Sequence, residues 1–148
     1  MNSEIRYQRF TELTNEELYR ILQLRSEVFV VEQDCAYQDI DGLDQISVHC
    51  SIVEGEDLAA YLRYFMSPDD SSVMKLGRVI VAEKYRGKKL GAVLIADAID
   101  VIKQTDASEI FIAAQAHLQK FYSDLGFVTC SEVYDLDNID HVDMVLKF

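Results

Sequence analysis

The sequence predicts a mixed α+β domain in which helices pack on a largely antiparallel sheet. Two alternating segments, "ISVHCSIV" and "LAAYLRYFM", flank the polar turn "EGED", which is typical of a β-hairpin. Further along the chain, two segments carry apolar residues at every third or fourth position, as helices do. The 148 residues include one Pro and six Gly, which leaves little room for a linker. We therefore expect one domain over residues 1–148.

The N-terminal region is expected to form a strand, "EIRYQRF", followed by a capped helix. Thr14 and Glu17 have the spacing of a capping box, and Leu18, Ile21 and Leu22 then share one helical face. The next segment, "EVFVVEQDCAYQDIDGLD", is first apolar and then acidic and irregular. We interpret it as a loop or short helix beside the substrate.

Three strands are expected in the middle of the chain. The first hairpin strand places His49 on its polar face, and the residues on its opposite face are Ile46, Val48, Cys50 and Ile52. The third strand is "VMKLGRVIV", in which Gly77 indicates a bulge or a close approach of backbone.

Helices and strands alternate in the C-terminal half. The first helical stripe consists of Leu90, Val93, Leu94, Ala98, Val101 and Ile102, and the second of Leu118, Phe121, Tyr122 and Leu125. The strand "EIFIAA" separates them, and Gly126 is expected to end the second helix at the C′ position. The segments "FVTCSEVY" and "HVDMVLKF" complete the chain as strands.

The chain is strongly acidic, with 14 Lys and Arg against 26 Asp and Glu and a net charge of −12. This charge argues against nucleic acid as a partner and favours a cationic or neutral substrate. The apolar runs are shorter than a membrane span requires. Three cysteines without a CxxC pair are typical of a reduced protein. We therefore expect a cytoplasmic protein with neither a membrane nor a nucleic-acid partner.

Basic residues nevertheless gather around the stretch "YRGKKLG". They are Lys75, Arg78, Lys84, Arg86, Lys88 and Lys89, and Glu83 is the only acidic residue among them. The stretch lies between a strand and a helix, where free backbone amides and the helix dipole favour an anion. The spacing matches neither a P-loop nor a GxGxxG fingerprint. The pattern is consistent with a phosphate site or with a solvated basic face.

The segment "VIVAEKYRGKKLG" resembles the acyl-CoA loop of the GCN5-related N-acetyltransferases (GNAT superfamily). Arg86 and Gly91 match the ends of the family's Arg/Gln-x-x-Gly-x-Gly/Ala pattern. Lys89 replaces its central glycine, and Glu83 replaces a proline that often precedes the loop. Because lysine is strained at positive φ, we predict a helical, negative φ at Lys89.

A second motif, "IFIAAQAHLQKFYSDLGF", resembles the family's downstream strand and helix. Gln115 takes the place of an asparagine, Tyr122 that of the tyrosine, and Gly126 and Phe127 follow as expected. The segments "LRSEVFVVEQDCAYQDIDGLD" and "HVDM" look like the ElaA branch of the superfamily. The resemblance covers essentially the whole chain.

The resemblance implies a GNAT fold, which has a central, mostly antiparallel sheet of about seven strands with helices on both faces. The sheet would be splayed between the strand ending at Val81 and the strand ending near Ala114, with acetyl-CoA between them. The residues expected to hold it are Val79, Ile80, Val81, Arg86, Gly87, Lys88, Lys89, Leu90, Gly91, Ala92 and Gln115. In this scheme residues 79–81 pair with pantetheine, and the amides of residues 87–92 bind pyrophosphate.

The activity implied is acetyl transfer from acetyl-CoA to a primary amine by direct attack in a ternary complex. Tyr122 is the candidate general acid, since a phenol can protonate the leaving thiolate, although its place on the apolar stripe is also consistent with a core residue. Glu32 and His141 are the candidate bases. A substrate that arrives deprotonated, with water accepting the proton, is a third possibility.

The acidic residues Asp34, Asp39, Asp41 and Asp44 are interpreted either as a rim that attracts an amine or as a solubilising loop. The segment "DIDGLD" lacks the remaining ligands of a calcium loop, so we expect no metal.

Two other functions remain open: a non-catalytic module on the same fold that binds acyl-CoA or a partner, and an acidic interaction domain. We expect a small-molecule or peptide amine as acceptor and allow for a homodimer.

Overall fold

The computed structural model describes residues 4–148. Its strands are β1 (Glu4–Arg9), β2 (Val48–Glu54), β3 (Asp57–Met66), β4 (Val73–Val81), β5 (Glu109–Gln115), β6 (Val128–Thr129), β7 (Tyr134–Leu136) and β8 (Ile139–Lys147). Its α-helices are α1 (Asn15–Arg25), α2 (Leu90–Ile102) and α3 (Gln119–Asp124). A π-helical segment, η2 (Ser26–Glu32), continues α1 without a break.

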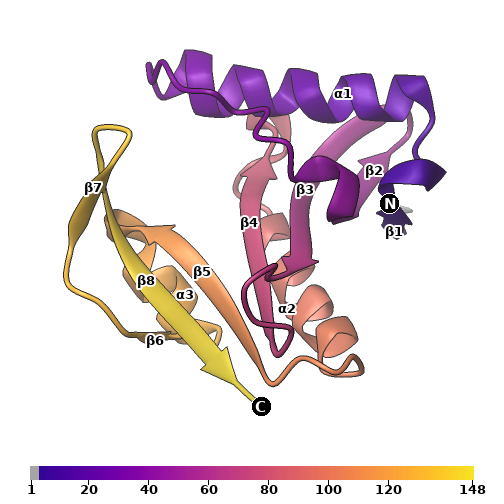
Figure 1. Ribbon diagram of the computed structural model, residues 1–148. Helices are drawn as coiled ribbons and strands as arrows, with labels where there is room; N and C mark the ends of the chain where they lie inside the picture. The colour runs from indigo at the N-terminus through magenta and orange to yellow at the C-terminus, as the bar shows by residue number, and fades with distance from the viewer. Residues whose placement is uncertain (1–3) are drawn as a thin grey trace.

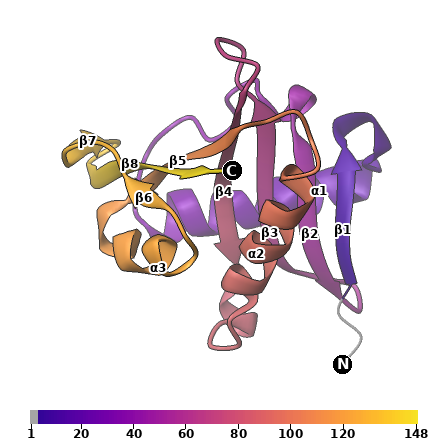
Figure 2. The same cartoon turned by 90° about the horizontal axis from the view of Figure 1, so that it is seen from below.

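The strands form one mixed sheet in the order β1-β2-β3-β4-β5-β8-β6, with β7 also paired to β8. All described neighbours are antiparallel except β4 and β5, which are parallel. Helices α1 and α2 cover opposite faces of the first four strands (Figure 2), because Ile21 packs on Tyr61 whereas Leu94 packs with Leu62. This arrangement confirms the predicted α+β class with helices on both faces.

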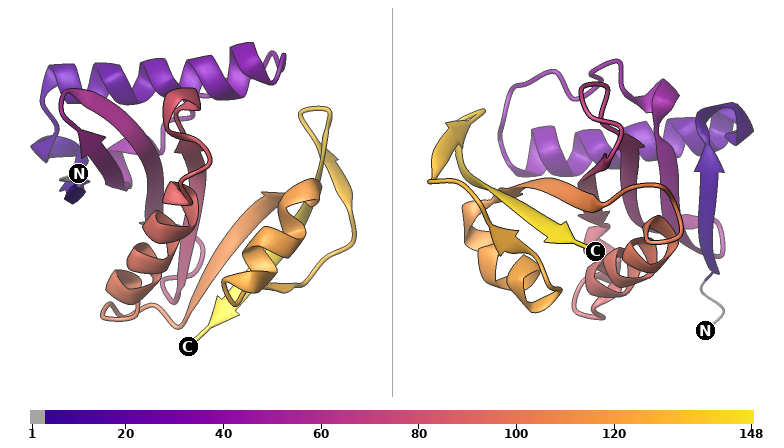
Figure 3. Two further views of the ribbon diagram at one scale, coloured as in Figure 1. Left: turned by 180° about the vertical axis from the view of Figure 1, so that it is seen from behind. Right: turned by 60° about the horizontal axis from the view of Figure 1, so that its bottom comes forward.

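The sheet opens into a V between β4 and β5 (Figure 1). The two strands pair only from Val73 to Lys75 and from Glu109 to Phe111, and then diverge. One arm carries β1–β4 with α1 and α2, and the other carries β5–β8 with α3 (Figure 3). The predicted splay between the strand ending at Val81 and the strand ending near Ala114 is confirmed.

Local signals in the sequence position several of these elements. Thr14 and Glu17 form the predicted capping box at the start of α1. Gly126, at φ +106°, follows α3 as expected of a C′ residue. The predicted irregularity near Gly77 is a β-bulge, because the register on β3 shifts between Tyr61 and Arg63, and Arg78 beside it has φ +55°.

Three predicted positions are wrong. Ile46, expected on the apolar face of the first hairpin strand, lies in a 3-10 turn before β2 and is 55% exposed. Val93, expected on the buried stripe of α2, is 49% exposed, and the helix buries Ile95 and Ile99 instead. His49 is buried like its neighbour Cys50, because β2 is covered on both faces, so strict alternation does not describe it. The expected strand over "FVTCSEVY" is reduced to the two short strands β6 and β7. Within residues 4–148, no helix has the length and apolarity needed to cross a bilayer.

Candidate active site

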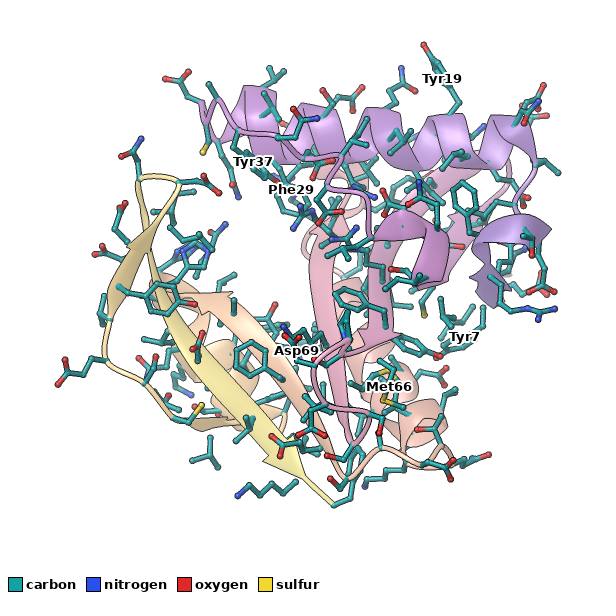
Figure 4. The ribbon with its side chains drawn as sticks, in the orientation of Figure 1. Tyr7, Tyr19, Phe29, Tyr37, Met66 and Asp69 are labelled. Atoms are coloured by element: carbon teal, nitrogen blue, oxygen red, sulfur yellow. The ribbon has the colours of Figure 1, made fainter. Side chains whose placement is uncertain are left out.

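A cleft of about 800 Å³ lies where β4 and β5 separate. Its walls come from the two strands, the loop before α2, the end of η2 and the β7–β8 hairpin. Figure 4 shows Phe29 and Tyr37 between α1 and the upper end of β4. Every residue predicted to bind the cofactor lines this cleft except Lys88, and so do Tyr122, Glu32 and His141.

The loop before α2 presents free backbone amides. The amides of residues 87–92 donate no hydrogen bond to any described residue, and the first helical bond runs from the Val93 amide to the Lys89 carbonyl. Gly87 turns the chain at φ +85°. A run of free amides at the start of a 13-residue helix fits a pyrophosphate, since each amide needs an acceptor.

Lys89 departs from the prediction. Its φ is +60°, in the left-handed region, and not helical. The loop reverses direction at this residue before α2 begins at Leu90, so the position has the geometry that favours the glycine typical of the family. A lysine there costs on the order of 1 kcal/mol.

Three of the six clustered basic residues are already paired. Arg78 contacts Asp39 and Asp41, Lys84 contacts Asp57, and Arg86 contacts Glu32. The local positive excess expected from the sequence is therefore not all available to a bound anion. Lys88 and Lys89 have no carboxylate within 4.0 Å among residues 4–148, and the Lys88 ammonium lies 5.5 Å from the centre of the Tyr85 ring.

Glu32, a candidate base, is held by Arg86. The two Nη atoms of Arg86 donate to the two carboxylate oxygens of Glu32 at 2.9 and 3.0 Å, and its Nε donates to the Val81 carbonyl at 3.0 Å. This bidentate contact joins the end of η2 to the loop before α2. Both carboxylate oxygens of Glu32 are thus already engaged by Arg86, which disfavours Glu32 as the base.

Tyr122 lies on α3 and is 7% exposed. Its ring meets Phe121 and Phe127 edge to face, as the core interpretation expects. The Tyr122 hydroxyl has no hydrogen-bond partner among the described residues. Every fully buried side-chain oxygen in residues 4–148 does have a partner, so the Tyr122 hydroxyl is not fully buried. Because Tyr122 lines the cleft, its hydroxyl opens to the cleft. Burial raises the pKa of Tyr122 to about 12, which keeps the phenol protonated at neutral pH.

His141 lies near the start of β8, directly opposite Gln115 on β5. Its Nδ1 is 2.7 Å from the Ile139 carbonyl oxygen, and its ring stacks on Tyr134. Because a carbonyl only accepts, Nδ1 carries the proton in the neutral ring, and Nε2 is left as the basic nitrogen.

Gln115 connects the two arms of the V. Its Nε2 donates to Oε1 of Gln33, just beyond η2, at 3.3 Å. A second cross-cleft contact joins the Cys35 thiol to the Asp137 carbonyl at 3.0 Å. Neither contact was predicted, because the partners lie 82 and 102 residues apart in sequence.

The cleft-side edge of β4 has no strand neighbour beyond Lys75. Val81 and Ile80 pair with β3 on the other side, whereas β5 has already diverged. Residues 79–81 thus present a free strand edge inside the cleft, as predicted for pairing with pantetheine.

Three of the four carboxylates of the acidic segment form neither a rim nor a solubilising loop, whereas the fourth, Asp34, is exposed. The three carboxylates Asp39, Asp41 and Asp44 point inward onto three arginines, Arg25, Arg63 and Arg78. We call these six residues the arginine–aspartate cluster. Arg25 is fully buried and bonds both Asp39 and Asp44, at 2.9 and 2.6 Å. Within residues 4–148, no group of His, Cys, Asp and Glu side chains is arranged to hold a metal ion.

A family model for the acetyltransferase (GNAT) domain matches residues 9–148. The chain belongs to the GNAT family of acetyltransferases. It is 42% identical to Protein ElaA of Escherichia coli (strain K12) over 137 residues, which is 90% of each chain. The crystal structure of Escherichia coli ElaA matches with a TM-score of 0.92 at 39% identity, covering 99% of this chain and all of that one.

An acyl-CoA N-acyltransferase from Pseudomonas aeruginosa is also similar, with a TM-score of 0.91 at 37% identity over 98% of this chain and 99% of that one. These relatives confirm the GNAT fold, the ElaA-like branch and the acyltransferase class.

Proposed function

We propose that the protein transfers an acetyl group from acetyl-CoA to a primary amine by direct attack in a ternary complex. The observation that carries the proposal is the cleft in which the free amides of residues 87–92, the free edge of residues 79–81 and the open hydroxyl of Tyr122 all meet. Acetyl-CoA supplies an activated acyl carbon. The amine forms a C–N bond to it as the C–S bond breaks.

The chain's residues bind and orient the reactants and move two protons. Holding both reactants in line supplies much of the rate acceleration. The Tyr122 phenol gives its proton to the departing thiolate, and its raised pKa keeps that proton available throughout the neutral range. The attacking amine must lose one proton in exchange.

Nε2 of His141 is the better placed of the two candidate bases. Glu32 is engaged by Arg86, whereas Nε2 of His141 has no hydrogen bond to a described residue. In the proposed mechanism Nε2 accepts the amine proton directly or through water. Glu32 instead positions Arg86 beside the acyl-CoA loop.

The Tyr122→Phe variant tests the general acid, with Tyr19→Phe on the exposed face of α1 as the matched control. Losing general-acid catalysis should lower kcat about 100-fold, while the Kd for acetyl-CoA is unchanged by calorimetry. Thiol release across a panel of amines gives the rate. Turnover equal to the control would refute the role of Tyr122.

A thermal-shift titration tests the cosubstrate itself. Acetyl-CoA at a hundredfold excess over its Kd should stabilise the fold by about 2.7 kcal/mol. The absence of any shift at millimolar acetyl-CoA would overturn the proposal. Binding without turnover on any amine would instead favour the non-catalytic module.

A further inference from the structure

A row of three side chains crosses the base of the V, where the sheet is still continuous. Phe65 on β3 pairs with Lys75 on β4, and Lys75 pairs with Phe111 on β5. All three line the cleft. We call them the floor row; Met66, the next residue on β3, is labelled in the lower half of Figure 4.

The floor row lies on the sheet face opposite α2. Met74 and Leu76, the neighbours of Lys75, are buried in the core that contains α2, so Lys75 points to the other face. The acyl-CoA loop opens α2 and belongs to the α2 side. The floor row is therefore free to contact the second substrate, which is the acceptor amine.

Lys75 differs from the other cations of the cleft. Arg63, Arg78 and Arg86 are each paired with at least one carboxylate. Lys75 is half-buried and has no carboxylate within 4.0 Å among residues 4–148, and its ammonium lies 5.8 Å from the centre of the Phe111 ring. Lys89 is also unpaired, but it belongs to the acyl-CoA loop.

An unpaired ammonium in a chain of net charge −12 is an attractive position for an anion. We propose that Lys75 is a specificity-determining residue that binds a carboxylate or similar anionic group on the acceptor amine. The aromatic rings of Phe65 and Phe111 would pack against the acceptor's apolar part. This inference rests on the proposed acetyl transfer and names the acceptor class: an amine that also carries an anion.

The strand geometry sets the length of such an acceptor. On β5, Phe111 is four residues from Gln115, which corresponds to about 13 Å, and Gln115 lies opposite His141 near the reacting end. The four-carbon stem of Lys75 spans part of this distance. The acceptor therefore needs several bonds between its amine and its anion, which favours an ω-amino acid over an α-amino acid.

Three amines of equal length test whether the acceptor carries an anion at its far end. They are 6-aminohexanoate, hexylamine and 1,6-diaminohexane, whose far ends are a carboxylate, a methyl group and an ammonium. With the intact enzyme and saturating acetyl-CoA, kcat/KM should be about tenfold higher for 6-aminohexanoate than for either other probe. Glycine should be a poor acceptor because its carboxylate cannot reach Lys75.

Two substitutions of Lys75 test the assignment. Lys75→Met keeps the stem and should remove the preference for 6-aminohexanoate, and Lys75→Glu should shift it to 1,6-diaminohexane. Lys103→Met is the matched control, because the Lys103 ammonium lies over the Phe148 ring at 5.9 Å in the same type of contact, outside the cleft lining. A normal acetyl-CoA Kd in all variants shows that they are folded.

The two proposals fail in different ways. If acetyl-CoA neither binds nor is consumed with any amine, the acetyl transfer fails. If amines are acetylated but 6-aminohexanoate has no advantage, or if its advantage survives in Lys75→Met, the transfer stands and the role of Lys75 is refuted.

Discussion

Two charge-rich segments lie next to β4, and they use their charges in opposite ways. In the acidic segment over residues 34–44, three carboxylates form ion pairs with three buried or half-buried arginines. In the basic loop over residues 87–92, the backbone amides have no hydrogen-bond acceptor, and Lys88 and Lys89 have no carboxylate partner, among residues 4–148. The comparison teaches that a run of like charges becomes a binding site only where the fold leaves it unpaired.

The largest effect is expected from Arg25→Met in the arginine–aspartate cluster. Arg25 is fully buried, so its loss leaves the three carboxylates of the cluster with only two arginines and one buried negative charge uncompensated. The free energy of unfolding should fall by about 3–5 kcal/mol, measured by urea denaturation. Arg20→Met, at an exposed position paired with Glu16, should change it by less than about 0.5 kcal/mol. Equal effects would mean that the cluster is not structural.

The next largest effect is a loss of stability at acidic pH that depends on Asp41. Burial opposes ionisation of Asp41, but the hydrogen bonds from Arg63 prevail and lower its pKa from 3.8 to about 2. The unfolded state therefore binds the proton more readily, and stability falls as the pH drops from about 4 to about 2. Because Asp41 is partly open to solvent, which screens its contacts, the loss should be less than about 2 kcal/mol. Asp41→Asn should lose correspondingly less stability across that window; the same slope in both proteins would assign the loss to other groups.

A smaller effect is expected from charge reversal in the basic loop. The double variant Lys88→Glu with Lys89→Glu should raise the Kd for acetyl-CoA about tenfold, or about 1.4 kcal/mol, because two cations beside the phosphates become anions. The control reverses Lys103, at the opposite end of α2, and Lys147, paired in the sheet with Glu109, so the net charge changes by the same amount away from the loop. Isothermal titration calorimetry measures the acetyl-CoA Kd of both variants. An unchanged Kd in the loop variant would show that the loop does not bind phosphate.

The smallest effect is expected from Lys89→Gly. Glycine relieves the strain of the left-handed φ but has more freedom in the unfolded chain, so stability should rise by only about 0.5 kcal/mol. Lys88 does not have a positive φ, and Lys88→Gly should therefore lower stability. Thermal unfolding of both variants checks the sign, and destabilisation by Lys89→Gly would contradict the strain.

Local patterns in the sequence were enough to predict much of the fold. Thr14 and Glu17 cap a helix, Gly126 ends one, and Gly77 lies at a bulge, because each signal acts over a few residues. The two family motifs were enough to predict the splayed strands and the residues of the cleft. Their roles in binding and catalysis stay predictions.

What could not be predicted depends on contacts distant in sequence. Arg78 meets Asp39 across 39 residues, and Arg86 meets Glu32 across 54, so no local pattern indicates that these charges cancel. The positive φ of Lys89 was missed because residue preference favoured the helix, whereas the chain reversal before α2 decided the conformation. Lys75 was counted as one basic residue among six, and only the register of three strands places it between two phenylalanines.

The free edge of β4 also bears on solubility. An unpaired strand edge on a protein surface invites pairing with other chains and hence aggregation. Beyond Lys75 the β4 edge faces the second arm of the V across the cleft, and the pairing of residues 73–75 with residues 109–111 joins the two arms below it (Figure 1). A foreign strand would have to enter this confined space between the arms. The fold thus leaves the unpaired β4 edge accessible to a narrow ligand and shields it from the strands of other protein molecules.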